Sequence, residues 1–219
     1  QIGDPFVIPK PTETYATLAH KKAPKLRIGL MLTELVGVKV DPEVAAAVTA
    51  TGKMLESMGH SVEPVDGDLG GVDALRTMNE LFFFAFDARL DGYGKRTGRK
   101  PSADTLEPVI HLIYEWSKSI TPARFMAALS ACNTARRRMA QVYTKCDVLL
   151  SPTTARVSEP WGTYNLSMPG VDALSIVDRQ FAAPCQFTIP HNIMGTPAMS
   201  LPLAMHSTGV PIGVQIAAK

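Results

Sequence analysis

A strand–helix–strand pattern over residues 26–65 limits the possible folds more than any other feature of the sequence. Leu26–Thr33 is a short apolar run typical of a buried strand. Asp41 and Pro42 then supply a helix N-cap and a first-turn proline, and mostly apolar side chains recur every three or four positions after them, at Val44, Val48, Thr51, Leu55 and Met58. Gly59 ends this helix and His60–Val65 forms a second strand. Because about 40 residues suffice for a parallel crossover, we expect an α/β fold with a mixed sheet flanked by helices.

The rest of the chain alternates between helical patterns, loops and short apolar strands. Residues 72–90 predict one helix with a wide apolar face, residues 91–101 a loop, and residues 104–120 a second helix. A third helix starts at Thr121 and Pro122, with a stripe at Phe125, Leu129, Cys132, Met139 and Val142. Residues 147–152 predict a buried strand, and residues 153–180 predict a long loop with one short helical turn. The chain then predicts two closing strands, at 197–205 and 213–218, with a turn at 206–209. Residues 1–25 predict an extended lead-in.

Composition excludes several classes of protein. Hydrophobic residues make up 46% and charged residues 19%, with a net charge of +2, which excludes a disordered chain and provides no basic stripe for nucleic acid. The longest strongly apolar run, residues 81–86, is too short to span a bilayer. Three widely spaced cysteines favour neither a disulfide framework nor a zinc site, so we expect a cytoplasmic protein that needs no membrane, metal or cofactor.

No motif in the chain marks a self-sufficient active site. GxSxG, SxxK, HExxH and the glycine-rich phosphate loops are all absent from the sequence. Cys185 lies near His191 in sequence, but a buried or pocket-lining thiol is the simpler interpretation than a Cys–His pair. The run Arg136–Arg138 is interpreted as a solvated helix face in preference to a binding patch.

The last third of the chain carries a specific resemblance. A buried strand ending in Ser151-Pro152 is followed by an Asn-x-x-Gly-x-Pro-Ala segment and a Gly-x-Pro-x-Gly-x-Gln segment, formed by Asn192, Gly195, Pro197, Ala198, Gly209, Pro211, Gly213 and Gln215. This order of residues resembles the closing segments of the amidase signature family. The strand and helix of residues 26–65 fit the same family, so the resemblance extends along essentially all 219 residues. We interpret Asn192 and Gly195 structurally, with Gly195 at a positive φ angle before a strand.

The resemblance implies hydrolysis of amide C–N bonds by a serine nucleophile, a second serine held by a cis peptide bond and a lysine base. The Gly/Ser-rich segment and the lysine of that mechanism lie in the N-terminal half of the family, and no such string occurs here. We therefore expect no catalytic residue in this chain. Residues 1–219 are expected to be the C-terminal portion of a longer amidase domain, inactive alone, with residues 26–150 forming the strand–helix unit and helices and residues 151–219 the pocket rim and closing strands.

The resemblance also places a substrate pocket between residues 72–90 and 180–196, with Asn79, Phe83, Cys185 and Phe187 as its candidate residues. Glutamine-binding relatives have an acidic residue where Cys185 stands, so a neutral or apolar amide, linear or cyclic as in the cyclic-dimer hydrolases of the family, is the expected substrate. The alternatives are a non-catalytic small-molecule binding module and a fragment of an amidotransferase A-type subunit. Expected partners are the absent N-terminal half and further copies of the chain, because half of a fold would expose an apolar face.

Overall fold

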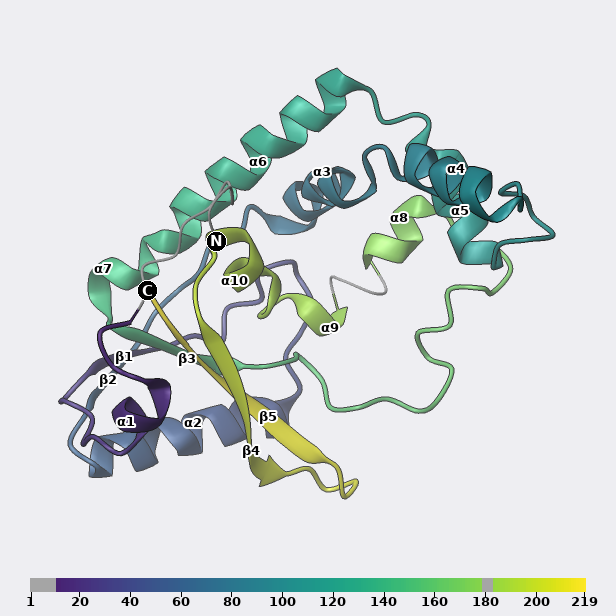
Figure 1. The fold of residues 1–219 in the computed structure, drawn as a ribbon. Helices are drawn as coiled ribbons and strands as arrows, with labels where there is room; N and C mark the ends of the chain where they lie inside the picture. Colours follow the sequence, from purple (N-terminus) through teal and green to yellow (C-terminus); the bar gives the residue numbers. More distant parts are fainter. Residues whose placement is uncertain (1–10, 179–182) are drawn as a thin grey trace.

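The computed structural model describes residues 11–178 and 183–219 and is built on a mixed sheet with helices on both faces (Figure 1). The strands lie in the order β2-β1-β3-β5-β4, with bounds Arg27–Leu30 for β1, Ser61–Pro64 for β2, Val148–Pro152 for β3, Ala198–Met205 for β4 and Pro211–Ala218 for β5. β1 pairs in parallel with β2 and β3, whereas β5 pairs antiparallel with β3 and β4. The expected α/β fold with a mixed sheet is confirmed.

The strand–helix–strand unit forms as its sequence predicts. Helix α2, Pro42–Ser57, connects the parallel strands β1 and β2. The Asp41 carboxylate accepts hydrogen bonds from the backbone N–H groups of Glu43 and Val44, which satisfies two of the donors that a helix leaves open at its start. The helix therefore begins where the Asp-Pro pair places it.

Each face of the sheet has its own apolar layer. Successive residues of β3 point to opposite faces, so Leu150 packs with Val48 of α2 on one side, whereas Leu149 joins the larger cluster on the other. That larger cluster is covered by helices α3 (Gly71–Phe83), α6 (Pro122–Ala140) and α7 (Val142–Lys145) (Figure 1). β3 lies in the middle of the sheet and is the strand that both layers bury.

The single helix predicted over residues 72–90 is wrong, because α3 ends at Phe83 and α4, Phe86–Thr97, follows after a break. Phe84 is extended (ψ 130°) and Ala85 adopts a left-handed conformation (φ 56°). The break lets neighbouring rings reach different helices. Phe84 stacks on Phe125 of α6 at 4.4 Å between ring centroids, whereas Phe83 meets Trp116 of α5 edge-on at 5.7 Å. Tertiary aromatic packing therefore overrides the helical pattern.

Other boundaries also differ from the expectation. Most of the loop predicted over residues 91–101 belongs to α4, which ends at Gly98 in a left-handed cap. The helix expected from residue 104 begins at Pro108 (α5, Pro108–Ser117). Part of the lead-in is helical, as α1, Tyr15–Ala19, while the prediction for residues 1–10 falls outside the described residues. In α6 the small residues Ala128 and Ala135 are buried, whereas Leu129, which the pattern predicted on the apolar face, is exposed.

The end of the chain follows the prediction closely. Residues 153–172 form a long connection without regular structure, followed by the short helices α8 (Ala173–Ile176), α9 (Ala183–Cys185) and α10 (Ile189–Met194). β4 and β5 form the closing hairpin. Among the described residues β4 pairs only with β5, and its Met199, Leu203 and Met205 are exposed. This edge strand presents apolar side chains and carries no charged residue.

Candidate functional site: a pocket between α3, α6 and α10

Asn79 is buried inside the protein, although a polar residue on a mostly apolar helix could equally have faced solvent. It lies on α3, is only 4% exposed, and its Nδ2 has no hydrogen-bond partner among the described residues. A buried amide donor without a partner costs free energy, so such a group calls for a specific explanation. The helix it belongs to is otherwise buried through Leu75 and Met78.

Asn79 lines a pocket of about 350 Å³ where three helices meet. This size lies within the range of small-molecule sites. The lining residues are mostly apolar and come from α3, α6 and α10: Leu75, Met78, Asn79, Leu81, Phe82, Cys132, Arg136, Ile189, Asn192 and Ile193. Thus residues of α3 and α10, from the two segments expected to line a pocket, lie around one cavity. Asn79 is the predicted pocket residue found there, and Asn192, which the sequence suggested to be structural, lines it as well.

Arg136 is the only charged residue among the described residues that line this pocket, and the sequence pattern missed it. Its side chain bridges two helices, because Nε donates to the Ile193 carbonyl of α10 at 2.8 Å and Nη1 donates to Asn133 Oδ1 at 3.1 Å. No ion pair to Arg136 is formed by any carboxylate in residues 11–178 and 183–219. The run Arg136–Arg138 is thus exposed as expected, but its first member also anchors α10 and presents a positive charge to the cavity.

The remaining candidate residues lie elsewhere. Phe83 packs between Phe86 and Trp116. Phe187 is fully buried in the main core. Cys185 is half-buried, and burial raises the pKa of its thiol, which keeps it neutral and works against a nucleophilic thiolate. None of these three side chains is among those that line the pocket between α3, α6 and α10.

The motif residues of the last third form a buried polar connection. Gln215 of β5 is 4% exposed, and its Nε2 donates to Phe187 O at 2.8 Å and to Ser151 Oγ of β3 at 3.2 Å. Gln186 makes a parallel contact, donating from Nε2 to Val38 O at 2.8 Å. These two amides join the irregular segment around residue 187 to the sheet and to the loop after β1.

Two glycines of the motif are required by geometry. Gly195 ends α10 at φ 71°, the positive φ expected for it. A side chain at Gly213 would come within 2.9 Å of both Thr153 Oγ1 and Ser200 Oγ, which are themselves 2.6 Å apart. Pro197 lies one residue before β4, where its lack of an N–H costs no ladder bond.

His191 is a buried structural residue rather than the partner of a cysteine. Its Nδ1 lies 2.8 Å from Thr196 Oγ1, which closes the turn after α10, and burial lowers the pKa of the imidazole. No serine hydroxyl is hydrogen-bonded to a lysine or a histidine in the described part of the chain. Residues 11–178 and 183–219 also contain no cluster of three or more metal-ligating side chains and no helix long and apolar enough to cross a membrane.

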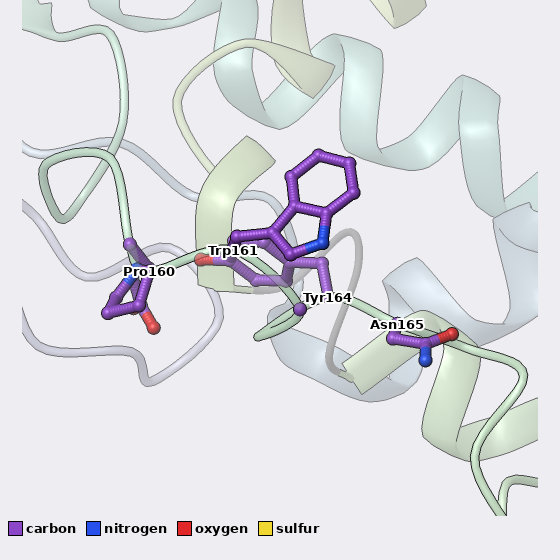
Figure 2. A pocket seen from close by; sticks show the side chains of 6 residues that line it. Pro160, Trp161, Tyr164 and Asn165 are labelled. Atoms are coloured by element: carbon purple, nitrogen blue, oxygen red, sulfur yellow. The ribbon is translucent and has the colours of Figure 1, made fainter.

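A second hollow, of about 530 Å³, belongs to the long loop after β3 (Figure 2). It is lined by Glu159, Pro160, Trp161, Gly162, Tyr164 and Asn165. The Trp161 ring stands out from the loop in Figure 2 and is completely exposed. Because all of its walls come from one loop segment, this hollow lacks the convergence of several elements that the pocket between α3, α6 and α10 shows.

Comparisons with known proteins cover the whole chain. The family model described as Amidase matches residues 3–219. A 6-aminohexanoate-cyclic-dimer hydrolase of Paenarthrobacter ureafaciens is 28% identical over 99% of this chain, and one of Pseudomonas sp. (strain NK87) is 29% identical over 99%. The solved structure of a 6-aminohexanoate cyclic dimer hydrolase complexed with substrate superposes with a TM-score of 0.86 and 27% identity, over 100% of this chain and 46% of that one. The chain spans about 45% of the length of these curated relatives.

Proposed function

The chain belongs to the amidase family, whose members hydrolyse amide C–N bonds, and from that premise we propose that it is the C-terminal portion of an amidohydrolase. The observation that carries this proposal is the superposition of the entire chain on a cyclic dimer hydrolase, at a TM-score of 0.86. The catalytic serines and lysine of the enzyme would be supplied by residues outside this chain, and residues 1–219 alone would be inactive.

The substrate of the proposed enzyme is a neutral or apolar amide, linear or cyclic. The wall of the pocket between α3, α6 and α10 is mostly apolar, which supports an apolar body for the substrate, and its polar side chains are Asn79, Arg136 and Asn192. Cys185 does not line this pocket, but its thiol, whose pKa is raised by burial, stays uncharged and offers no carboxylate to a substrate ammonium group at that position. The free thiols of Cys132 and Cys146 agree with a reducing compartment, and we propose the cytoplasm.

The test compares the full-length gene product with residues 1–219 on a cyclic diamide, a linear N-alkyl amide and glutamine. We expect the full-length protein to release amine from the first two much faster than ammonia from glutamine, and residues 1–219 to release neither. Turnover by residues 1–219 that disappears when one of their own serines is replaced would contradict the proposal. A preference for glutamine would favour an amidotransferase-type subunit instead.

We also propose that the open edge of β4 contacts the part of the enzyme outside this chain, and that the isolated chain self-associates there. The support is the apolar, uncharged and exposed strand Ala198–Met205, together with relatives about twice as long. Light scattering should show residues 1–219 as dimers or larger species, and Met199→Lys should shift them to monomers, since a charge on an edge strand opposes pairing. As a control, Met54→Lys on the outer surface of α2 should leave the distribution unchanged.

A further inference from the structure

We infer that the pocket between α3, α6 and α10 binds the carboxylate of a short aliphatic acid, the class of product that hydrolysis of an aliphatic amide releases. This inference rests on the proposed function for the origin of the acid, but the site itself is defined by side chains of this chain. Its polar groups converge from α3, α6 and α10, and its remaining wall is apolar.

The charge of the pocket selects an anionic ligand. Among the described lining residues Arg136 alone is charged, and no described carboxylate pairs with it. Two of its nitrogens are engaged, Nε with Ile193 O and Nη1 with Asn133 Oδ1, and these bonds hold the guanidinium at the cavity. Nη2 has no hydrogen bond to a described residue, so a donor remains for a ligand oxygen. A guanidinium and a carboxylate form short, charge-assisted hydrogen bonds.

Asn79 adds a second donor inside the same cavity. Its amide is buried and its Nδ2 is without a partner. Nδ2 is shielded from solvent in the structure, so binding would require a half-turn of the amide that directs its N–H groups into the cavity. The two-fold terminal torsion of asparagine, with oxygen and nitrogen of nearly the same size, allows this rotation. A carboxylate accepts hydrogen bonds and donates none, which matches a site whose polar groups include a guanidinium and an amide N–H. An alkylammonium ion would meet a like charge.

The apolar wall favours a ligand whose carboxylate is attached to an aliphatic chain. Leu75, Met78 and Phe82 of α3 line the cavity together with Ile189 and Ile193 of α10. An aliphatic chain buried there gains free energy with each methylene that leaves water. The ligand is therefore an acid with several methylenes, and acetate is too small to use this wall.

The experiment titrates the full-length gene product with a series from acetate to octanoate by calorimetry, and with hexanamide and hexylamine as uncharged and cationic counterparts. We expect one saturable site per chain, with affinity rising about fourfold per methylene until the cavity is full. Arg136→Gln should weaken hexanoate binding about tenfold, and Asn79→Leu should weaken it severalfold. The control Arg137→Gln, next to Arg136 but outside the lining, should bind like the parent protein.

Because Arg136 also anchors α10, Arg136→Lys separates charge from scaffolding. It keeps the charge and loses the planar fork, so hexanoate should bind better to this variant than to Arg136→Gln, and binding should weaken with added salt. Equal binding of hexanoate and hexylamine, or unchanged hexanoate binding by Asn79→Leu and Arg136→Gln, would overturn the inference. Amide hydrolysis is measured in parallel: turnover without acid binding refutes this inference alone, whereas acid binding without turnover refutes only the proposed function.

Discussion

Replacing Gln215 by methionine should destabilise the protein strongly although it barely changes the volume of the side chain. Gln215 Nε2 donates to Phe187 O and to Ser151 Oγ, and the residue is 4% exposed. Methionine keeps the shape and removes both bonds. Ser151 Oγ still donates to Pro152 O, so the main loss falls on the Phe187 carbonyl, which becomes a buried acceptor without a donor.

Each lost hydrogen bond costs about 1 kcal/mol, and the buried Phe187 carbonyl without a donor adds a further cost. Together they should lower the free energy of unfolding by about 3 kcal/mol. For a chain of this length that corresponds to a drop in Tm of about 6–12 °C. The assay is urea unfolding followed by circular dichroism, with thermal melts alongside. The matched control is Gln141→Met, where an exposed amide makes one 3.3 Å bond to Arg137 O and its loss should be close to neutral. A Gln215→Met variant as stable as this control would refute the reasoning.

Three further predictions concern backbone conformation, one ion pair and one buried amide. Ala85→Gly should raise the free energy of unfolding by about 0.5–1 kcal/mol, because Ala85 is held at φ 56°. Gly195→Ala should lower it by about 1 kcal/mol, because Gly195 ends α10 at φ 71°. Urea unfolding measures both changes, and changes of the same sign would contradict the argument from left-handed backbone conformation. Arg27 holds the pKa of Asp147 down at about 2, from 3.8, so their stabilising interaction is present above the unfolded pKa and is lost as the pH falls through the folded pKa. Asp147→Asn should therefore be less stable than the parent protein at about pH 6, and the difference should shrink steadily as the pH falls from about 4 through 2. A difference that stays the same from about pH 6 to pH 2 would rule this out. Asn79→Leu should unfold at a higher urea concentration than the parent protein, since it removes a buried donor without a partner, and a lower midpoint would show that Nδ2 is satisfied.

The sequence was most informative where local chemistry and packing agree. Asp41 and Pro42 predict the start of α2, Gly59 its end, and the short apolar runs around it the parallel strands β1 and β2. The closing hairpin was predictable for the same reason, because its turn residues and strand pattern are local. The cap hydrogen bonds of α2 and the turn of the hairpin lie within a few residues of the sequence signals that predict them.

The sequence failed where distant partners decide the conformation. The aromatic run around residue 84 has a helical period, yet Phe83 and Phe84 have different partners, Trp116 and Phe125, and the chain breaks to reach both. No local signal encodes that choice. For the pocket, Asn79 was recognisable as a polar residue on an apolar helix, but Arg136 looked like one member of a solvated cluster. Its role depends on α10, which lies 57 positions further along the chain.

The sheet changes from parallel to antiparallel pairing at β3, and this has a consequence for the order in which the protein folds. The β4–β5 hairpin closes over residues 206–210, so its pairing costs little loop entropy. Pairing of β1 with β3 joins residues such as Arg27 and Asp147 that are 120 positions apart. We expect the hairpin to provide a template on which β3 docks, while β1 and β2 join last. A chain cut between α4 and α5 would then retain a hairpin-and-β3 unit that folds quickly, and the slow kinetic phase would belong to the N-terminal strands.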